Sequence, residues 1–451
     1  MGLRYALRSM RWAAWVAACS GVVFSLICSA TSVFAMPPVE RTVLPSQLVL
    51  LTSEDHSLPT VTLELLIDSG SRRDPVGKEG LAYLTSKGLL LGTKKRIAEQ
   101  LNEELDFMGA SLTATSGRDY ATVSLRVLKK DLDRGLDLFI DVLRQPAFPE
   151  DEVRDEIQKT LASIQSAEDQ PGDVAEKQFQ KSLFLKSPYG HPVEGTKQSL
   201  AGLNHGDLAR FFETYYHPNN AILALVGDVT MEEVKARVLP LLAKWPVGEI
   251  PEESFRVDFA KGPETIKIER AITQANIILG QEGVSRGNPD FYALSVMNYI
   301  LGGGGFASRL TEEIRNSRGL AYDVQSFFDP GKYPGSFQIV LQTKNGSARE
   351  AISLSLEQIE RIRKEPVSEK EIEAAQKYLI GSFPMRFDTQ AKLANFLIQV
   401  EYYGLGLDYP EKYPTFIRAV TKEEILRVAQ AYLHPDRCIL VIVANLQEAG
   451  F

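Results

Sequence analysis

One segment of the chain occurs twice, and this duplication constrains the fold more than any other feature of the sequence. "RFFETYYHPNNAILALVGDV" begins at Arg210 and "RVAQAYLHPDRCILVIVANL" begins at Arg427, so that matching arginine, tyrosine, histidine and proline residues lie 217 positions apart. Pro75 and Pro289 end two further related segments, "LLIDSGSRRDP" and "IILGQEGVSRGNP", 214 positions apart. A period of about 215 residues is a whole domain rather than a solenoid unit. The sequence therefore predicts two homologous halves.

Both halves contain strands and helices in blocks. Residues 61–67 alternate apolar and polar side chains, which is typical of a half-buried strand, and residues 111–116 and 120–127 flank a hairpin signal. The helices that we predict span residues 94–108, 130–143 and 150–166 in the first half, and residues 290–301, 348–364 and 368–379 in the second. Because strand and helix do not strictly alternate, the pattern favours an α+β fold over a doubly wound sheet.

The predicted organisation has four parts. Residues 246–263 are rich in proline, glycine and acidic residues, which is typical of an extended linker. We therefore expect a leader at residues 1–35, a first domain at residues 36–245, the linker, and a second domain at residues 264–451.

The leader is typical of a secretory signal peptide. It combines a basic start that contains Arg4, Arg8 and Arg11, an apolar run, and Val33 and Ala35 at positions that fit cleavage after Ala35. An uncleaved membrane anchor is the alternative. We expect an exported, periplasmic protein that has no membrane contact once the leader is removed.

The composition excludes several kinds of chemistry. Removal of the leader changes the formal net charge from −8 to −11, which argues against nucleic acid as a partner. Cys438 is then the one remaining cysteine, so an internal disulfide is excluded. No two of the five histidines lie three or four positions apart, so no helix offers a pair of imidazoles to a metal. The glycine-rich stretch from Leu301 lacks the lysine of a phosphate loop and indicates a close backbone approach or flexibility.

Five segments together resemble the pitrilysin/insulinase family of zinc peptidases, to which mitochondrial processing peptidase and the respiratory-complex core proteins are similar. They are "EGLAYLTSKGLLLGT" from Glu79, "FPEDEVRDEI" from Phe148, "PYGHPVEGT" from Pro188, "YYHPNN" from Tyr215 and "GGGGFASRLTEEIRNSRGLAYDV" from Gly302. The segments follow the family's order over nearly the whole chain after the leader. The bacterial exported branch with two halves is the best match.

The resemblance implies a zinc site that this chain has lost. Active members carry H-x-x-E-H on a helix of the first half, and a later glutamate completes the coordination. Alignment places Tyr83 and Lys87 at the two histidines, Ser86 at the catalytic glutamate, and Ser163, 76 residues beyond Lys87, at the later ligand. An ammonium cannot bind zinc, a phenol is a poor ligand and serine is no general base. We therefore expect no zinc in this chain.

Lys87 raises a further hypothesis, because it lies roughly where the positive charge of the metal would be. Glu156 precedes Ser163 by two helical turns, on about the same face of its helix. A Lys87–Glu156 pair could replace the metal as the cross-link between the two helices. The alternative is that both side chains are solvated.

The second half keeps a different part of the family's active site. The resemblance implies an arginine and a tyrosine, spaced R-x6-Y, that hold the substrate backbone and the developing oxyanion across the chamber. In "RNSRGLAY" these positions are Arg315 and Tyr322, at a helix end, a turn at Gly319 and the start of a strand. An ordinary surface pair is the alternative.

These residues together predict a non-catalytic subunit of a heterodimeric exported zinc metallopeptidase, inactive alone. A homologous partner with an intact H-x-x-E-H motif would hold the zinc in a clamshell-like dimer, and unfolded peptide would be the substrate. Residues 110–116 are a candidate edge strand for this peptide, with an ordinary hairpin as the alternative. A stand-alone structural or peptide-binding protein, like the core proteins, is the second hypothesis. A peptidase with its own unorthodox metal site is the third.

Overall fold

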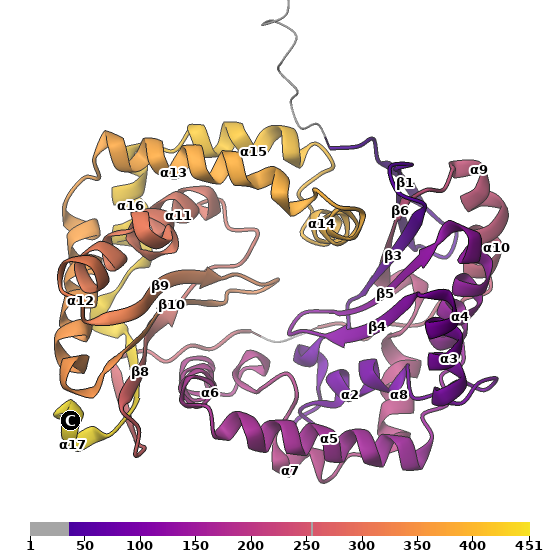
Figure 1. Ribbon diagram of the computed structural model, residues 1–451, viewed down its shortest axis with the longest axis horizontal. Coiled ribbons are helices and arrows are strands. Elements are labelled where there is room, and N and C mark those ends of the chain that lie inside the picture. The colour runs from indigo at the N-terminus through magenta and orange to yellow at the C-terminus, as the bar shows by residue number, and fades with distance from the viewer. Residues whose placement is uncertain (1–35, 254–255) are drawn as a thin grey trace, which may run out of the picture. The chain divides into compact units, whose positions relative to one another are not determined.

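The computed structural model describes residues 36–253 and 256–451 (Figure 1). The predicted signal peptide lies outside the described residues. All elements below belong to one compact unit, Pro38–Phe451. Among the described residues, no helix combines the length and the apolar character that a membrane span requires.

The first half is built on a mixed sheet of six strands. In spatial order they are β1 (Glu40–Val43), β2 (Val49–Glu54), β6 (Ala221–Gly227), β3 (Thr60–Ile67), β5 (Ala121–Leu128) and β4 (Ser111–Ser116). β2 and β6 run parallel, and the other neighbours are antiparallel. β3 is central, so that Leu63 lies opposite both Leu125 and Leu225.

The second half repeats this topology with five strands. Their order is β7 (Glu264–Glu269), β11 (Ile439–Ala444), β8 (Gln274–Glu282), β10 (Ser336–Lys344) and β9 (Ala321–Asp329). β7 and β11 are parallel, as β2 and β6 are, and the other neighbours are antiparallel. Apart from β1, which has no counterpart, the strands of the two sheets agree in order and direction, which confirms the α+β class and the two related halves.

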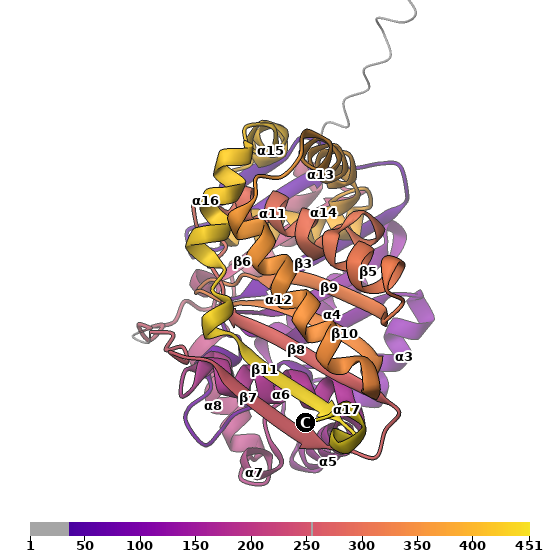
Figure 2. The same cartoon turned by 90° about the vertical axis from the view of Figure 1, so that its left-hand side faces the viewer.

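Helices surround each sheet. Those of the first half are α2 (Leu81–Gly88), α3 (Ala98–Met108), α4 (Leu132–Arg144), α5 (Glu150–Glu168), α6 (Pro171–Phe184), α7 (Lys197–Leu200), α8 (His205–Tyr215), α9 (Met231–Glu233) and α10 (Leu239–Leu242). Those of the second half are α11 (Phe291–Asn298), α12 (Ala348–Lys364), α13 (Glu369–Ser382), α14 (Gln390–Tyr402), α15 (Tyr409–Arg418), α16 (Lys422–Tyr432) and α17 (Leu446–Ala449). Figure 2 shows α12 across β8 and β10, which it contacts.

Five of the six predicted helices differ from the observed ones at one or both ends, and only residues 348–364 match at both. The helix predicted at residues 94–108 begins at Ala98, because the preceding residues form a tight turn in which the Thr93 N–H donates to the Arg96 carbonyl at 2.7 Å. The helix predicted at residues 290–301 is α-helical only to Asn298 and continues as a π-helical turn, Tyr299–Gly303.

Each half contributes one helix to the other half's sheet. α14 packs on β3 and β6, and α6 packs on β8 and β11. The strand predicted as half-buried is therefore buried on both faces: Leu63 faces the main core, while Leu66, on the opposite face, is also only 1% exposed. Polar contacts fix α14 in place, because Gln390 accepts a hydrogen bond from Thr60 Oγ1 at 2.6 Å and Arg41 pairs with Glu401 at 2.7 Å.

A buried ionic network connects the two halves and the segment between them. The side chain of Arg72 is fully buried and lies 2.6 Å from Asp68 and 2.8 Å from Glu253. Asp68 also pairs with Lys332 at 3.0 Å and accepts a hydrogen bond from the Tyr402 hydroxyl at 2.7 Å. Burial opposes ionisation, but the charges of Arg72 and Lys332 outweigh it and hold the pKa of Asp68 below its ordinary value.

The packing of α6 on the second sheet leads to a stability prediction. Phe179 is fully buried, and its ring fills the space where a Cβ on Gly280 of β8 would lie. Phe179→Ala should lower the free energy of unfolding by about 3–5 kcal/mol, and the control Lys181→Ala, on the exposed side of α6, by less than about 0.5 kcal/mol. Urea denaturation followed by tryptophan fluorescence measures both. Equal effects of the two substitutions would contradict this packing.

Candidate functional site

The helix that matches the family's zinc-binding helix begins at a buried carboxylate. Asp74 accepts hydrogen bonds from the N–H groups of Gly80 and Ala82, both at 2.7 Å, and so satisfies two free donors at the start of α2. Burial raises the pKa of Asp74 to about 8, although these two bonds favour the ionised form. Gly80 has φ +95°, and a Cβ there would lie 2.6 Å from the Glu194 carbonyl oxygen, which explains the glycine turn before the helix.

The four positions of the lost zinc site carry no set of metal donors. Tyr83 and Lys87 are half-buried, with the Lys87 ammonium 5.6 Å from the centre of the Tyr83 ring, and Ser86 is fully buried and donates to the Tyr83 carbonyl at 2.8 Å. Ser163 is an exposed residue of α5. Burial, and then the charges of Glu156 and Glu194, raise the pKa of Tyr83, which makes a phenolate ligand less accessible. The residues present do not fit zinc, and the described part of the chain contains no cluster of three histidine, cysteine, aspartate or glutamate side chains arranged for a metal.

The predicted ion pair between Lys87 and Glu156 does not form. In the described ranges no carboxylate pairs with Lys87, and Glu156 instead lies 3.8 Å from Lys159, one turn along its own helix. Lys87 lies over the Tyr83 ring, a contact within its own helix. The two helices α2 and α5 are in contact, but this pair does not cross-link them.

Arg315 and Tyr322 meet in space, as the resemblance implies. Arg315 lies in the π-helical segment η8 (Thr311–Ser317), the chain turns at Gly319 with φ +63°, and Tyr322 is the second residue of β9. The guanidinium carbon of Arg315 is 5.0 Å from the centre of the Tyr322 ring and 4.6 Å from that of Phe306. Tyr322 is 78% exposed and Phe306 is 69% exposed, so the stack faces solvent. Phe306 was not predicted as part of this site, although an aromatic residue directly after four glycines was a signal for it.

The charge of Arg315 is not neutralised by an ion pair with any described residue, whereas the neighbouring Arg318 pairs with Glu313 at 3.3 Å and Glu350 at 3.4 Å. Two aromatic faces hold the guanidinium of Arg315 and leave its N–H edge available. Such a group, beside a phenol, can donate hydrogen bonds to a peptide carbonyl or to the oxyanion of a tetrahedral intermediate.

The glycine-rich stretch covers the outer edge of β9. A Cβ on Gly302 would lie 2.6 Å from the Ser326 backbone nitrogen, and the Asn298 side chain donates to the Ser326 carbonyl at 3.0 Å. Thr311 Oγ1 donates to the Val324 carbonyl at 3.4 Å. The prediction of a close backbone approach is confirmed, and this edge is closed to a further strand.

β4 is an edge strand whose outer side has no such cover. Among the described residues its backbone makes no hydrogen bond beyond those to β5, so the N–H and C=O groups of the other side are free. β4 contacts α2, the helix that carries the lost zinc site. An extended peptide could add a strand here by main-chain hydrogen bonds.

The helical turn that carries Arg315 is anchored by one charged pair. Arg309, just before η8, lies 2.6 Å from Glu371 of α13. Burial favours the neutral form of the Glu371 carboxyl and raises its pKa. Hydrogen bonds from Arg309 and Ser368 outweigh this effect and lower the pKa of Glu371 to about 2.

The two sheets, the helix frame and the Arg315–Tyr322 pair define a duplicated α+β protein of the zinc-peptidase type. The family described as "Insulinase (Peptidase family M16)" matches residues 49–197, and "Peptidase M16 inactive domain" matches residues 202–379. The chain belongs to the M16 family of peptidases.

Relatives agree with this assignment over most of the chain. An uncharacterised zinc protease of Rickettsia bellii (strain RML369-C) is 29% identical over 85% of this chain and 90% of its own. A Helicobacter pylori protein named "Non-peptidase homolog YmxG" is 25% identical over 88% of this chain and 92% of its own. The crystal structure of a peptidase M16 inactive domain from Pseudomonas fluorescens superposes with a TM-score of 0.84 at 28% identity, over 90% of this chain and 98% of the other.

The anchor at Glu371 predicts a pH dependence. Because the pKa of Glu371 in the folded state, about 2, lies below its ordinary value of 4.5, its contribution to stability is complete above pH 4.5 and is lost as the pH falls toward 2. Glu371→Gln should lower the melting temperature at pH 7 and remove this part of the acid destabilisation. Thermal melts from pH 7 to pH 3 test it, with the exposed Glu411→Gln as control. An unchanged pH profile in Glu371→Gln would contradict the assignment.

Proposed function

We propose that this chain is the non-catalytic subunit of a heterodimeric zinc metallopeptidase. It binds extended peptide and presents Arg315 and Tyr322 to the zinc site of a homologous partner with an intact H-x-x-E-H motif. The two chains form a clamshell-like dimer in the periplasm, to which the leader at residues 1–35 directs this subunit. No step of the reaction passes through a metal held by this chain, because its own residues do not fit one.

One observation supports the proposal above all others: the guanidinium of Arg315 is positioned by two aromatic rings and has no ion pair with a described residue. Other described arginines also lack an ion pair, but the two rings that hold Arg315 are themselves exposed, so that its guanidinium faces solvent beside a free phenol. A charge-assisted donor in this position is suited to a ligand. Arg315 would hold a substrate carbonyl oxygen, and the Tyr322 hydroxyl would donate to the same oxygen as negative charge develops.

The lost zinc site supports the assignment of roles. Tyr83, Ser86 and Lys87 replace two imidazoles and a general base, so this chain can supply the donor side of an active site and not the metal side. The relative named "Non-peptidase homolog YmxG" agrees with a non-catalytic role.

A stand-alone peptide-binding protein is the second candidate. The open edge of β4 favours it, because that edge can bind extended peptide by main-chain hydrogen bonds without any chemistry. Arg315 and Tyr322 would then have no part in proteolysis.

Peptide cleavage by the paired subunits distinguishes the two candidates. The purified chain is mixed with a homologue that carries H-x-x-E-H, and hydrolysis of a quenched fluorescent peptide is followed with and without chelator. Arg315→Ala and Tyr322→Phe should each lower kcat of the pair by about 10²-fold, because each removes an oxyanion donor. Arg318→Ala is the control. Full activity of both variants would favour the second candidate, and cleavage by this chain alone would contradict both.

Metal analysis gives an independent prediction. After exposure to zinc and removal of free metal, this chain should retain no stoichiometric zinc, whereas the partner should hold about one ion per chain. Mass spectrometry of the metal content measures both. Retention of one zinc per chain here, lost in Tyr83→Phe, would indicate an unorthodox site at α2 and contradict the proposed roles.

A further inference from the structure

The two His-Pro turns of the duplicated segment differ in what lies against them. In the first half, the turn at His217 leads into η4 (Pro218–Asn220). The Nε2 atom of His217 is 2.8 Å from the Glu213 carbonyl oxygen, and its Nδ1 atom is 3.0 Å from the Pro246 carbonyl oxygen. One ring nitrogen thus contacts the preceding helix, and the other contacts a distant segment of the chain.

That segment, Pro246–Gly248, is docked by its main chain. Asn219 Nδ2 donates to the Gly248 carbonyl at 2.8 Å, and the Gly248 N–H donates to Asn219 Oδ1 at 3.2 Å. A Cβ on Gly248 would lie 2.2 Å from the His217 ring, so the close approach requires glycine. The turn therefore acts as a receptor for an extended segment that contains proline and glycine.

The second half repeats the His-Pro turn without this occupant, and Asp436 takes the place of Asn219, so that this position can accept a hydrogen bond from a backbone N–H but donates none. His434 Nε2 is 3.0 Å from the Ala431 carbonyl oxygen, which repeats the contact between His217 and the preceding helix. Within the described residues, His434 Nδ1 has no hydrogen-bond partner. His434 and Arg437, at the end of η11 (Pro435–Arg437), line an open pocket of about 860 Å³ instead.

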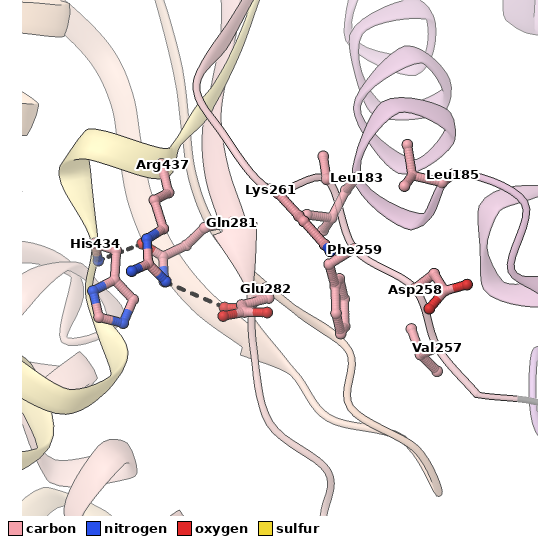
Figure 3. A pocket seen from close by; sticks show the side chains of 11 residues that line it. Leu183, Leu185, Val257, Asp258, Phe259, Lys261, Gln281, Glu282, His434 and Arg437 are labelled. Carbon is pink, nitrogen blue, oxygen red and sulfur yellow. Dashed lines mark hydrogen bonds between the residues drawn. The ribbon is translucent and has the colours of Figure 1, made fainter.

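Figure 3 shows the two sides of this pocket. Arg437 of η11 and the adjoining His434 lie on one side, and Val257, Phe259 and Lys261 lie on the other. Leu185, just after α6, is 51% exposed and adds apolar surface, whereas Leu183, which also lines the pocket, is only 1% exposed.

The charged groups around the pocket suit a polypeptide main chain. The exposed cations Lys261 and Arg437 and the exposed acids Asp258 and Glu282 make no ion pair with any described residue. Cations can donate hydrogen bonds to peptide carbonyls, and carboxylates can accept them from N–H groups. The pocket therefore combines apolar contact area with donors and acceptors of both kinds, which is what an extended peptide requires.

We infer that the pocket at His434 binds an extended segment of another polypeptide that contains proline and glycine, in the way that the turn at His217 binds Pro246–Gly248. His434 Nδ1 and the Arg437 guanidinium hold its carbonyl oxygens, and Val257 and Phe259 contact its apolar side chains. This site lies on the second half of the chain and does not depend on the proposed role of Arg315.

A peptide with the chain's own sequence tests the inference. The probe is fluorescein-labelled "KWPVGEIP", which corresponds to residues 244–251, and its binding to the purified chain is measured by fluorescence anisotropy. Saturable binding is expected, and His434→Ala and Arg437→Ala should each weaken it by at least about tenfold. His205→Ala, at an exposed histidine elsewhere, is the control. A peptide with leucine in place of its glycine should bind at least about tenfold more weakly, because the ring of His434 then meets a side chain.

Three outcomes would overturn the inference. The first is that the peptide shows no saturable binding. The second is that the peptide binds the native chain and the Arg437→Ala variant with equal affinity, since Arg437 is exposed and its loss leaves the fold intact. The third is self-association of the chain that Arg437→Ala abolishes in analytical ultracentrifugation, which would show that a second copy fills the pocket.

Discussion

Where the two halves of the chain meet, the guanidinium of Arg72 is fully buried, and Asp68 and Glu253 neutralise it from two sides. A buried cation is tolerated only while its partners stay in place, since removal of one partner costs several kcal/mol. Glu253 belongs to the segment between the halves, and Asp68 is also bound by Lys332 and Tyr402 of the second half. The charge thus constrains both halves and the connection between them.

The candidate surfaces are divided between the two halves. The first half offers an open strand edge at β4 and a helix frame without metal donors. The second half offers a free guanidinium between two rings, while its own edge strand, β9, is covered by the glycine-rich stretch. Duplication has therefore produced two halves with one topology and different surfaces. The same divergence separates the occupied turn at His217 from the open pocket at His434.

Much of the fold was predictable from local pattern. The helix at residues 348–364 was predicted to the residue, because its apolar spacing and its ends are both local signals. The meeting of Arg315 and Tyr322 followed from a short turn. The exchange of α6 and α14 could not be predicted, because nothing in a helix's own sequence says which sheet it covers. The prediction of the Lys87–Glu156 pair was wrong for a similar reason. Helical spacing predicts that Glu156 and Ser163 share a face of α5, but it does not give the distance from Glu156 to a residue of α2. Glu156 lies near Lys159 of its own helix instead.

The exchanged helices have a consequence for the order in which the parts of the chain can fold. One face of β3 and β6 is covered by α14, which ends at Tyr402, so the first sheet keeps an apolar face open until the second half is present. The first half therefore cannot complete its core as an independent unit, unlike a domain that folds by itself. Until α14 docks, Leu66 and its neighbours remain uncovered.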